Sequence, residues 1–270
     1  MKQQTKLNNN NYYTPESNKK YLSVSQYKDF FGTLGRKGCE AKALAKLNGQ
    51  YKEEPSTAML VGSYIDSYVE GTLESFKENN PDIFKKDGSL KSDYIQAESI
   101  ISRIEKDRKF MQYLSGEKQT IMTAEIFGVE WKIKMDSYIK HKAIVDLKIV
   151  KDIYETFYVP GFGRKLNFIE NYGYDFQLAI YQKVVELNTG KQLPCFIAVA
   201  DKTKTTAIEL IQITQSELDS ALVGVESGVE RIKLLKAGEI EPDRCGRCDF
   251  CKETKVITKP ILMSALLEAA

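Results

Sequence analysis

Apolar and polar residues alternate along residues 121–150, whereas on both sides of this segment apolar residues recur every three or four positions. An alternation with a period of two is typical of β-strands, and a period near 3.6 is typical of amphipathic helices. We therefore expect strands over 121–127, 129–139 and 143–150, with turns at Gly128 and at 140–142. A strand meander of this kind needs helices or a second sheet to cover its apolar face.

Helical periodicity precedes and follows the meander. We expect helices over 25–35, 38–47, 56–76, 92–114, 174–187 and 216–236. Two further strands are expected over 194–200 and 205–213, and the apolar run of the first predicts a strand buried on both faces. This order of elements predicts one α/β domain with a central mixed β-sheet flanked by helices.

Composition and charge limit the organisation of the chain. Residues 1–20 contain no apolar run and predict a flexible polar tail, residues 21–240 the main domain, and residues 241–270 a cysteine-containing segment and tail packed on that domain. No stretch approaches 18 consecutive apolar residues, so we expect a cytoplasmic protein without membrane contact. The net charge of +2 excludes a protein that coats nucleic acid by electrostatic attraction alone. A local basic groove remains open, because the segment from Trp131 to Lys151 contains six lysines and only two acids.

Two acids and a lysine interrupt the predicted strands. If 140–142 is a three-residue loop, Ile139 faces Ala143, and Asp136 then faces Asp146 with the Cβ atoms about 5 Å apart. Lys148 lies two residues further along the same face. Two carboxylates this close share either a proton or a cation, and their oxygens suit Mg²⁺ or Mn²⁺. The alternative is a solvated sheet face on which lysines neutralise two exposed acids.

Such a metal site would suit phosphodiester hydrolysis. The metal would polarise the phosphodiester and activate a water, and a second metal about 4 Å away would stabilise the leaving oxygen. Lys148 would orient the water or offset charge in the transition state.

Three further motifs stand around this hairpin. Residues 22–30 read LSVSQYKDF, residues 60–71 read LVGSYIDSYVEG and residues 174–181 read YDFQLAIY. Together with Asp136 and the Asp146-x-Lys148 triplet, and in this order, they resemble the PD-(D/E)XK nuclease superfamily, RecB-like branch, and within it the phage and prophage exodeoxyribonuclease VIII-like proteins. The resemblance covers roughly residues 22–200 and implies a restriction-endonuclease-like core in the domain over 21–240.

The resemblance also implies roles for individual residues. It implies four metal ligands: Asp66, Asp136, Asp146 and the backbone carbonyl of Leu147. Asp66 stands where the family usually has a histidine. The implied catalytic residues are the two hairpin acids together with Lys148, Gln177 and Tyr181. The last two, four apart on one helix face, would position the scissile strand or the attacking water.

Three of the five cysteines form a C-x-x-C-x-x-C segment at 245, 248 and 251. In a reducing compartment this spacing indicates a metal site rather than disulfides. The pattern of Cys39 before the nuclease core and Cys245, Cys248 and Cys251 after it resembles the cysteine site of AddB-type and certain CRISPR-associated nucleases. Four thiolates hold either a [4Fe–4S] cluster or Zn²⁺, and the alternative is unligated thiols. Cys195, in an apolar strand, is expected to be a packing residue.

The resemblance implies an Mg²⁺- or Mn²⁺-dependent DNA exonuclease that resects duplex ends for phage-type recombination. Its partners would be DNA, a single-strand annealing protein and further copies of the chain in a homo-oligomer. Two alternatives remain. One is a nuclease-fold DNA-binding or assembly subunit that does not cut, which the missing histidine favours and the intact Asp-x-Lys opposes. The other is a related exonuclease that acts on single-stranded DNA.

Overall fold

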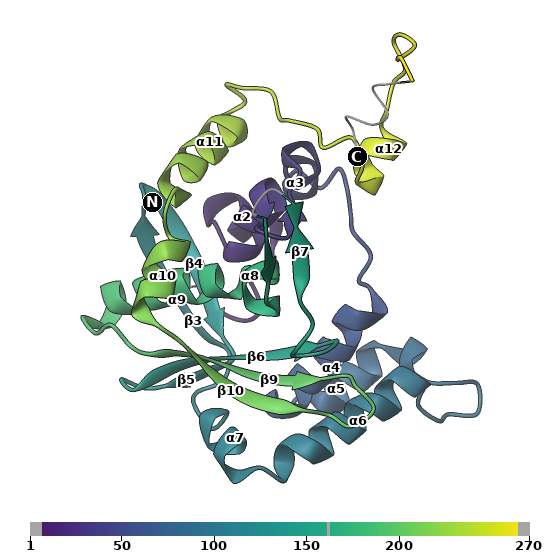
Figure 1. The fold of residues 1–270 in the computed structure, drawn as a ribbon, viewed down its shortest axis with the longest axis vertical. Coiled ribbons are helices and arrows are strands. Elements are labelled where there is room, and N and C mark those ends of the chain that lie inside the picture. Colours follow the sequence, from purple (N-terminus) through teal and green to yellow (C-terminus); the bar gives the residue numbers. More distant parts are fainter. Residues whose placement is uncertain (1–6, 161–162, 264–270) are drawn as a thin grey trace.

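A mixed β-sheet forms the centre of the molecule in the computed structural model, which describes residues 7–160 and 163–263. The sheet order is β10-β9-β6-β5 within these residues (Figure 1). Ala143–Val150 (β6) runs parallel to Cys195–Asp201 (β9), while Ser137–Ile139 (β5) and Ile208–Ile213 (β10) run antiparallel to their neighbours. Thr120–Ile126 (β3) and Val129–Met135 (β4) form an antiparallel ladder beside it. The prediction of a mixed sheet flanked by helices is confirmed.

Helices cover both faces of the central sheet (Figure 1). One face carries Val24–Phe31 (α2), Phe168–Tyr172 (α8), Tyr174–Thr189 (α9), Gln215–Ala221 (α10) and Val225–Ala237 (α11). The other carries Thr57–Glu70 (α4), Leu73–Asn79 (α5), Ser92–Glu105 (α6) and Arg108–Tyr113 (α7). None of the helices in the described ranges has the length and apolarity needed to cross a membrane.

Shorter elements complete the described part of the chain. The helical ones are Pro15–Lys20 (α1), Glu40–Leu47 (α3), Pro81–Ile83 (η1, a 3₁₀ turn) and Asp249–Glu253 (α12). The strands are Gly32–Thr33 (β1) with Arg36–Lys37 (β2), and Phe157–Val159 (β7) with Arg164–Leu166 (β8).

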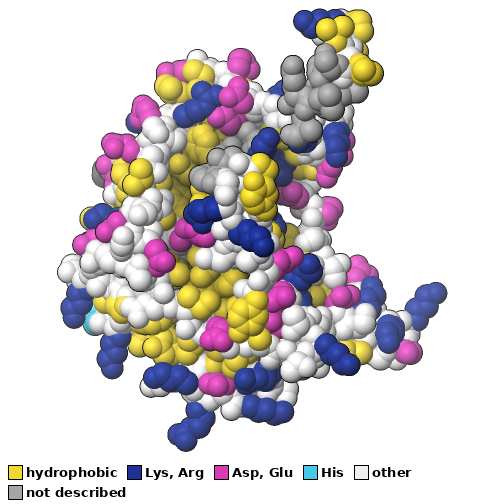
Figure 2. All heavy atoms as spheres, in the orientation of Figure 1, with side chains coloured by type: hydrophobic (Ala, Val, Ile, Leu, Met, Phe, Trp, Pro, Cys, Tyr) yellow, Lys and Arg dark blue, Asp and Glu magenta, His cyan; other side chains and the backbone are white. Residues whose placement is uncertain are grey.

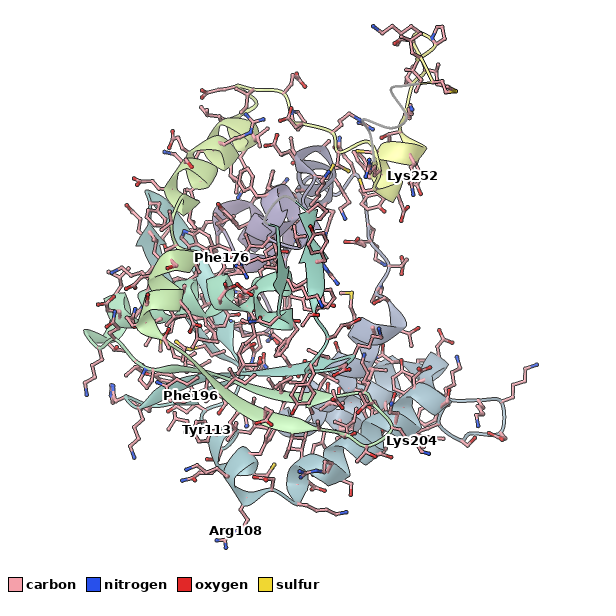
Figure 3. All side chains as sticks on the ribbon, in the orientation of Figure 1. Arg108, Tyr113, Phe176, Phe196, Lys204 and Lys252 are labelled. Atoms are coloured by element: carbon pink, nitrogen blue, oxygen red, sulfur yellow. The ribbon has the colours of Figure 1, made fainter. Side chains whose placement is uncertain are left out.

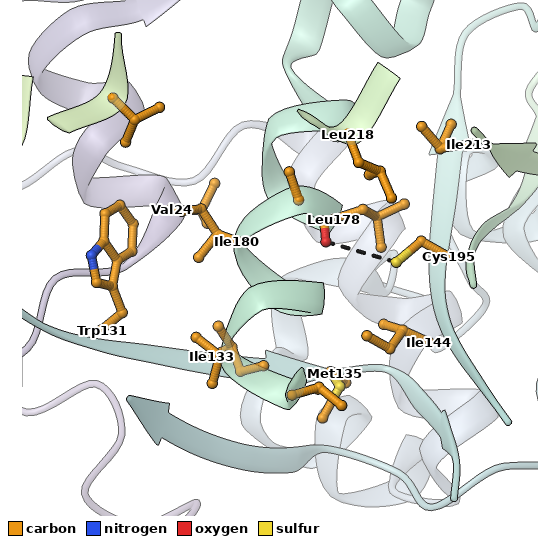
Figure 4. Close-up of a cluster of buried hydrophobic side chains, with 14 of the residues drawn as sticks. Val24, Trp131, Ile133, Met135, Ile144, Leu178, Ile180, Cys195, Ile213 and Leu218 are labelled. Carbon is orange, nitrogen blue, oxygen red and sulfur yellow. Dashed lines mark hydrogen bonds between the residues drawn. The ribbon is translucent and has the colours of Figure 1, made fainter. Parts of the chain in front are cut away.

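The alternation along β6 divides the interior into two cores. Ile144 belongs to the core beneath α9, where Figure 4 shows it near Met135 and Cys195. Cys195 is fully buried and its Sγ donates a weak hydrogen bond to the carbonyl of Leu178 at 3.8 Å, so its predicted packing role is confirmed. Leu147 faces the opposite core, under α4 and α6.

Aromatic rings close that second core at its edge. Tyr113, the last residue of α7, packs edge-on against Phe196 of β9, with ring centroids 4.9 Å apart (Figure 3). This contact fixes α7 against the sheet face that lies opposite α9.

The strand predicted over 129–139 is interrupted at Asp136, and this differs from the prediction. β4 ends at Met135 and β5 begins at Ser137. Met135 and Tyr138 both pack in the core under α9, whereas Ile139 packs in the opposite core, so the alternation expected of one strand over 129–139 does not continue across the break. The hairpin register is as predicted, because Ile139 pairs with Ala143.

Several predicted helices are shorter than the sequence indicated. Gly71, in the left-handed conformation, ends α4 where one helix over 56–76 was expected. The segments 92–114 and 216–236 are each divided into two helices. The helix expected over 25–35 begins at Val24 and ends at Phe31, and Ser23 is its N-cap, since its Oγ accepts from the amide of Gln26.

The prediction of a flexible tail is wrong for the described residues before 21. α1 is a regular helix and Tyr12 is only 6% exposed. The buried ammonium of Lys132 in β4 donates to the carbonyl of Tyr12, to Ser17 Oγ at 3.0 Å and to Asn18 Oδ1 at 2.7 Å. These bonds anchor the segment 12–20 on the sheet. Residues 1–6 of the predicted tail lie outside the described residues.

Candidate active site and cysteine site

The side chains that the sequence assigned to the active site line one cleft of about 400 Å³. They come from α4, from the break between β4 and β5, from β6 and from α9. The cleft residues among the predicted set are Asp66, Asp136, Asp146, Lys148, Gln177 and Tyr181. The folding of distant segments therefore brings this set together.

Asp146 lies in the middle of β6 and is 2% exposed. Gln177 Nε2 on α9 donates to its Oδ1 at 2.7 Å. Its Oδ2 is 2.5 Å from the ammonium of Lys148, but no described residue offers this buried oxygen a well-oriented hydrogen bond. A buried carboxylate oxygen with an unfilled lone pair fits a cation ligand.

Asp136 and Asp66 complete a crowded group of acids. Asp136 Oδ2 accepts from the amide of Leu147 at 2.9 Å, which ties the strand break to β6. Burial, reinforced by the negative charge of Asp146, holds the pKa of Asp136 well above its ordinary range. Burial also raises the pKa of Asp66 to about 7, although the charge of Lys148 opposes this rise. A bound cation would relieve the cost of ionising these acids.

Lys148 connects the acids to the backbone. Burial alone would lower the pKa of its ammonium, but the charges of Asp146 and Asp136 outweigh burial and hold the pKa above its ordinary value. The ammonium also donates to the carbonyl of Leu147 at 3.2 Å and lies 5.0 Å from the ring centroid of Tyr174. Lys148 is therefore charged at neutral pH. The Leu147 side chain is buried in the core, while its carbonyl turns toward the site.

Gln177 and Tyr181 share the face of α9 that meets the cleft. Burial raises the pKa of Tyr181 well above its ordinary value, and the charges of nearby groups, Asp146 and Asp136 among them, add to this effect. Tyr181 is thus a neutral phenol beside the acids.

The cleft also contains residues that the sequence analysis did not assign to the site. The added residues with charged or aromatic side chains are Tyr12, Tyr13, Lys28, Glu70, Lys132 and Lys134. The sequence spacing could have predicted two of these cleft residues. Glu70 follows Asp66 by four residues on one helix, and Lys134 precedes Asp136 by two residues along a strand, so each shares a face with a predicted site residue. No sequence spacing could have predicted Lys28 as a cleft residue, because it approaches the site only through the packing of α2 on α9. Burial, aided by the charge of Lys148, lowers the pKa of Lys28 to about 7.

The predicted cysteines meet at a second place, where α12 lies beside α3 (Figure 1). The sulfur atoms of Cys39, Cys245, Cys248 and Cys251 all lie within 4.8 Å of one another. The Sγ atoms of Cys39 and Cys251 are 3.5 Å apart.

The cysteine thiols differ in their electrostatic surroundings, because burial raises the pKa of Cys39 and raises that of Cys248 to about 12. Burial would raise the pKa of the Cys245 thiol, but hydrogen bonds from the amides of Arg247 and Cys248 bring it down to about 6. A thiol with this pKa is largely ionised at neutral pH, and the thiolate is the form that binds metals. The donor set fits a thiophilic ion or cluster.

The comparisons with known proteins agree with this geometry. Residues 23–254 match the family described as "PDDEXK-like domain of unknown function", and the chain belongs to this family of the PD-(D/E)XK nuclease class. A crystal structure from Eubacterium rectale, titled "Putative exonuclease", is 51% identical, with 97% of this chain and 98% of that chain covered and a TM-score of 0.94. The chain of SSO0001 is 14% identical, and its TM-score of 0.30 carries no weight. No curated protein matches the chain.

Proposed function

We propose that this chain is an Mg²⁺- or Mn²⁺-dependent DNA exonuclease. The observation that carries the proposal is the meeting of Asp136, Asp146 and Lys148 in one cleft, where the buried Oδ2 of Asp146 lies 2.5 Å from the Lys148 ammonium and accepts no well-oriented hydrogen bond from the described residues. Asp136 and Asp146 would hold the metal, with Asp66 and the Leu147 carbonyl as further ligands. The relative from Eubacterium rectale supports the exonuclease assignment by its title.

The bound metal would act as a Lewis acid on the phosphate and lower the pKa of a water. Gln177 would hold the Asp146 carboxylate in position through its amide, and the Leu147 amide would do the same for Asp136. The Lys148 ammonium would offset the negative charge that develops on the phosphate oxygens. Tyr181, as a neutral phenol at the cleft wall, would contact the scissile strand without repelling it.

The biological role in the proposal is resection of duplex DNA ends for phage-type recombination, with a single-strand annealing protein as partner and a homo-oligomer as the working form. It is supported by the order of the sequence motifs, which resembles that of exodeoxyribonuclease VIII-like proteins.

The test compares the wild type with Lys148→Ala on linear and on covalently closed DNA, in Mg²⁺, in Mn²⁺ and in EDTA. We expect degradation of linear DNA only, dependence on the metal, and a loss of rate on the order of 10² or more in the variant. Lys151→Ala is the matched control, because Lys151 follows β6 but its side chain is 80% exposed and pairs with Glu155 outside the cleft. Binding of DNA without any cleavage would instead support the non-cutting assembly subunit.

We further propose that the four cysteines bind one Zn²⁺. Four sulfurs about 2.3 Å from one tetrahedral ion stand about 3.8 Å apart, close to the separations of 3.5 Å and 4.0 Å between Cys251 and its neighbours Cys39 and Cys245. In a [4Fe–4S] cluster each thiolate binds a different iron, so the sulfurs stand farther apart. One equivalent of zinc in colourless protein is expected. Absorbance near 400 nm and stoichiometric iron after anaerobic purification would establish the cluster instead.

A further inference from the structure

We propose that Tyr13 is a stacking platform for an unpaired nucleobase of the DNA strand that enters the cleft, with Lys134 beside it as a contact for that strand's phosphates. The proposal rests on the proposed function and adds the form of the substrate, namely a strand with a free or frayed end. It gives a function to the segment before residue 21, which the sequence alone had predicted to be a flexible tail.

Tyr13 is placed to meet a ligand. Its side chain lines the same cleft as Asp136 and Lys148, yet it is 67% exposed. Its neighbour Tyr12 is buried and packs edge-on against it, with ring centroids 4.9 Å apart. Although Tyr12 packs edge-on against it and the Lys134 ammonium lies over its ring, Tyr13 remains 67% exposed at the edge of the cleft, so much of its aromatic surface is open to a ligand.

Lys134 supplies positive charge at this ring. Its ammonium lies 4.8 Å from the ring centroid of Tyr13 and 5.6 Å from that of Tyr12. Lys134 also lines the cleft, and its charge acts on Asp66 and on Glu70 of α4. The ammonium is therefore close to the aromatic pair and acts on the acids of the same cleft, so it would meet a phosphate of a strand that lies along this cleft.

The segment that carries Tyr13 is fixed before any ligand binds. Lys132, itself 1% exposed, donates to the carbonyl of Tyr12, to Ser17 and to Asn18. The Tyr12 hydroxyl donates in return to the carbonyl of Lys132 at 3.4 Å. Anchoring of this kind lowers the entropy cost of binding, because the ring does not have to be ordered by the ligand.

Aromatic rings interleaved with lysines are the usual means of binding single-stranded nucleic acid, since every base has a π-face and every nucleotide a phosphate. Inside a duplex both faces of each base are covered by neighbouring pairs, so only an end or an unpaired base can stack on Tyr13. On the face shown in Figure 2, lysine and arginine side chains are scattered among acids and form no continuous basic stripe. That face therefore offers no continuous basic track along which a DNA strand would bind.

The test measures binding of a single-stranded oligonucleotide that carries 2-aminopurine, with Ca²⁺ in place of Mg²⁺. We expect Tyr13→Ala to weaken binding on the order of tenfold and to abolish the quenching of 2-aminopurine by stacking, whereas Tyr13→Phe keeps both. Tyr154→Ala is the matched control, because Tyr154 is 70% exposed and lies outside the cleft lining. A thermal melt checks that each variant is folded.

The outcomes separate this inference from the proposed function. If Tyr13→Ala binds the oligonucleotide as tightly as Tyr154→Ala does, or if a relaxed, covalently closed circular duplex binds as tightly as the single strand, the stacking role is overturned. If binding and quenching depend on Tyr13 but no DNA is cut in Mg²⁺ or Mn²⁺, the stacking role stands and the nuclease proposal fails.

Discussion

Replacing Asp66 by asparagine should stabilise the metal-free protein at alkaline pH, although it removes a proposed metal ligand. The pKa of Asp66 rises from 3.8 to about 7 because the side chain is buried, with the nearby charges of Asp146 and Glu70 adding to the rise. An acid with a raised pKa binds more protons in the folded state than in the unfolded state between these two values. The stability of the wild type therefore falls as the pH rises from 3.8 to about 7, and stays low above it.

The magnitude follows from the size of the shift. One pKa unit corresponds to about 1.4 kcal/mol, so the difference between 3.8 and about 7 corresponds to about 4 kcal/mol of unfolding free energy. The Asp66 side chain is partly exposed to the cleft, and water there screens the charge, so we expect about half of this, roughly 2 kcal/mol, at pH 8. Asparagine lacks the charge and avoids the cost.

The assay is urea denaturation in EDTA at pH 8 and at pH 4. Asp66→Asn should exceed the wild type in stability at pH 8, and most of this difference should disappear at pH 4, where the aspartate is protonated in the folded state and about half protonated in the unfolded state. Glu78→Gln on α5 is the control, because its side chain is exposed and the same change of carboxylate to amide should have no effect. With Mg²⁺ added, the wild type should gain more stability than Asp66→Asn. Equal stability of variant and wild type at pH 8 without metal would refute the electrostatic account of the cleft.

Three further predictions concern the parts of the fold that support the sites. Cys251→Ser should release the bound ion and lower the unfolding free energy by about 3–5 kcal/mol, measured by metal analysis and denaturation, and retention of the ion would contradict the four-thiolate site. Lys132→Met should cost about 2–4 kcal/mol and speed amide hydrogen exchange over residues 12–20, because the carbonyl of Tyr12 loses its donor; unchanged exchange would show that Lys132 is not the anchor. Gly62→Ala, in the interior of α4 with open space around it, should raise stability by about 0.5–1 kcal/mol, whereas Gly116→Ala should lower it by about 2 kcal/mol, because the new Cβ would lie 2.6 Å from the backbone of Tyr138. Thermal melts measure both changes. A Gly116→Ala variant that is more stable than Gly62→Ala would contradict the packing described around these two glycines.

The site residues that could be predicted from the sequence are those whose positions follow from short-range geometry, namely the length of a hairpin loop, the register of its strands and the spacing along a helix. The three-residue loop sets the register that pairs Ile139 with Ala143, and this register carries Asp146 and Lys148 to the face near Asp136. Gln177 was placed by a resemblance of motifs, and helical spacing then put Tyr181 on the same face.

The remaining features depend on contacts between distant segments. Residues 12–20 are held in a regular conformation by hydrogen bonds from Lys132, which lies more than a hundred positions away in the sequence. The polar composition of the segment gave no indication of this contact and led to the prediction of a flexible tail. Alternation along 129–139 could not reveal the break at Asp136, because the amide that bonds its carboxylate belongs to Leu147 in the next strand. Helix ends such as Gly71 were missed because the apolar pattern continues beyond them.

The cysteine site has a consequence for how the protein is made. Cys39 and Cys251 are 212 positions apart, so a chain leaving the ribosome exposes the first thiolate long before the others have been synthesised. The hairpin with Asp136 and Asp146 can assemble in that interval, while the ion cannot yet be captured. If the four cysteines hold the proposed ion, metal loading is a late event of biosynthesis, and a cell starved of that metal would accumulate chains with a formed cleft but an empty cysteine site.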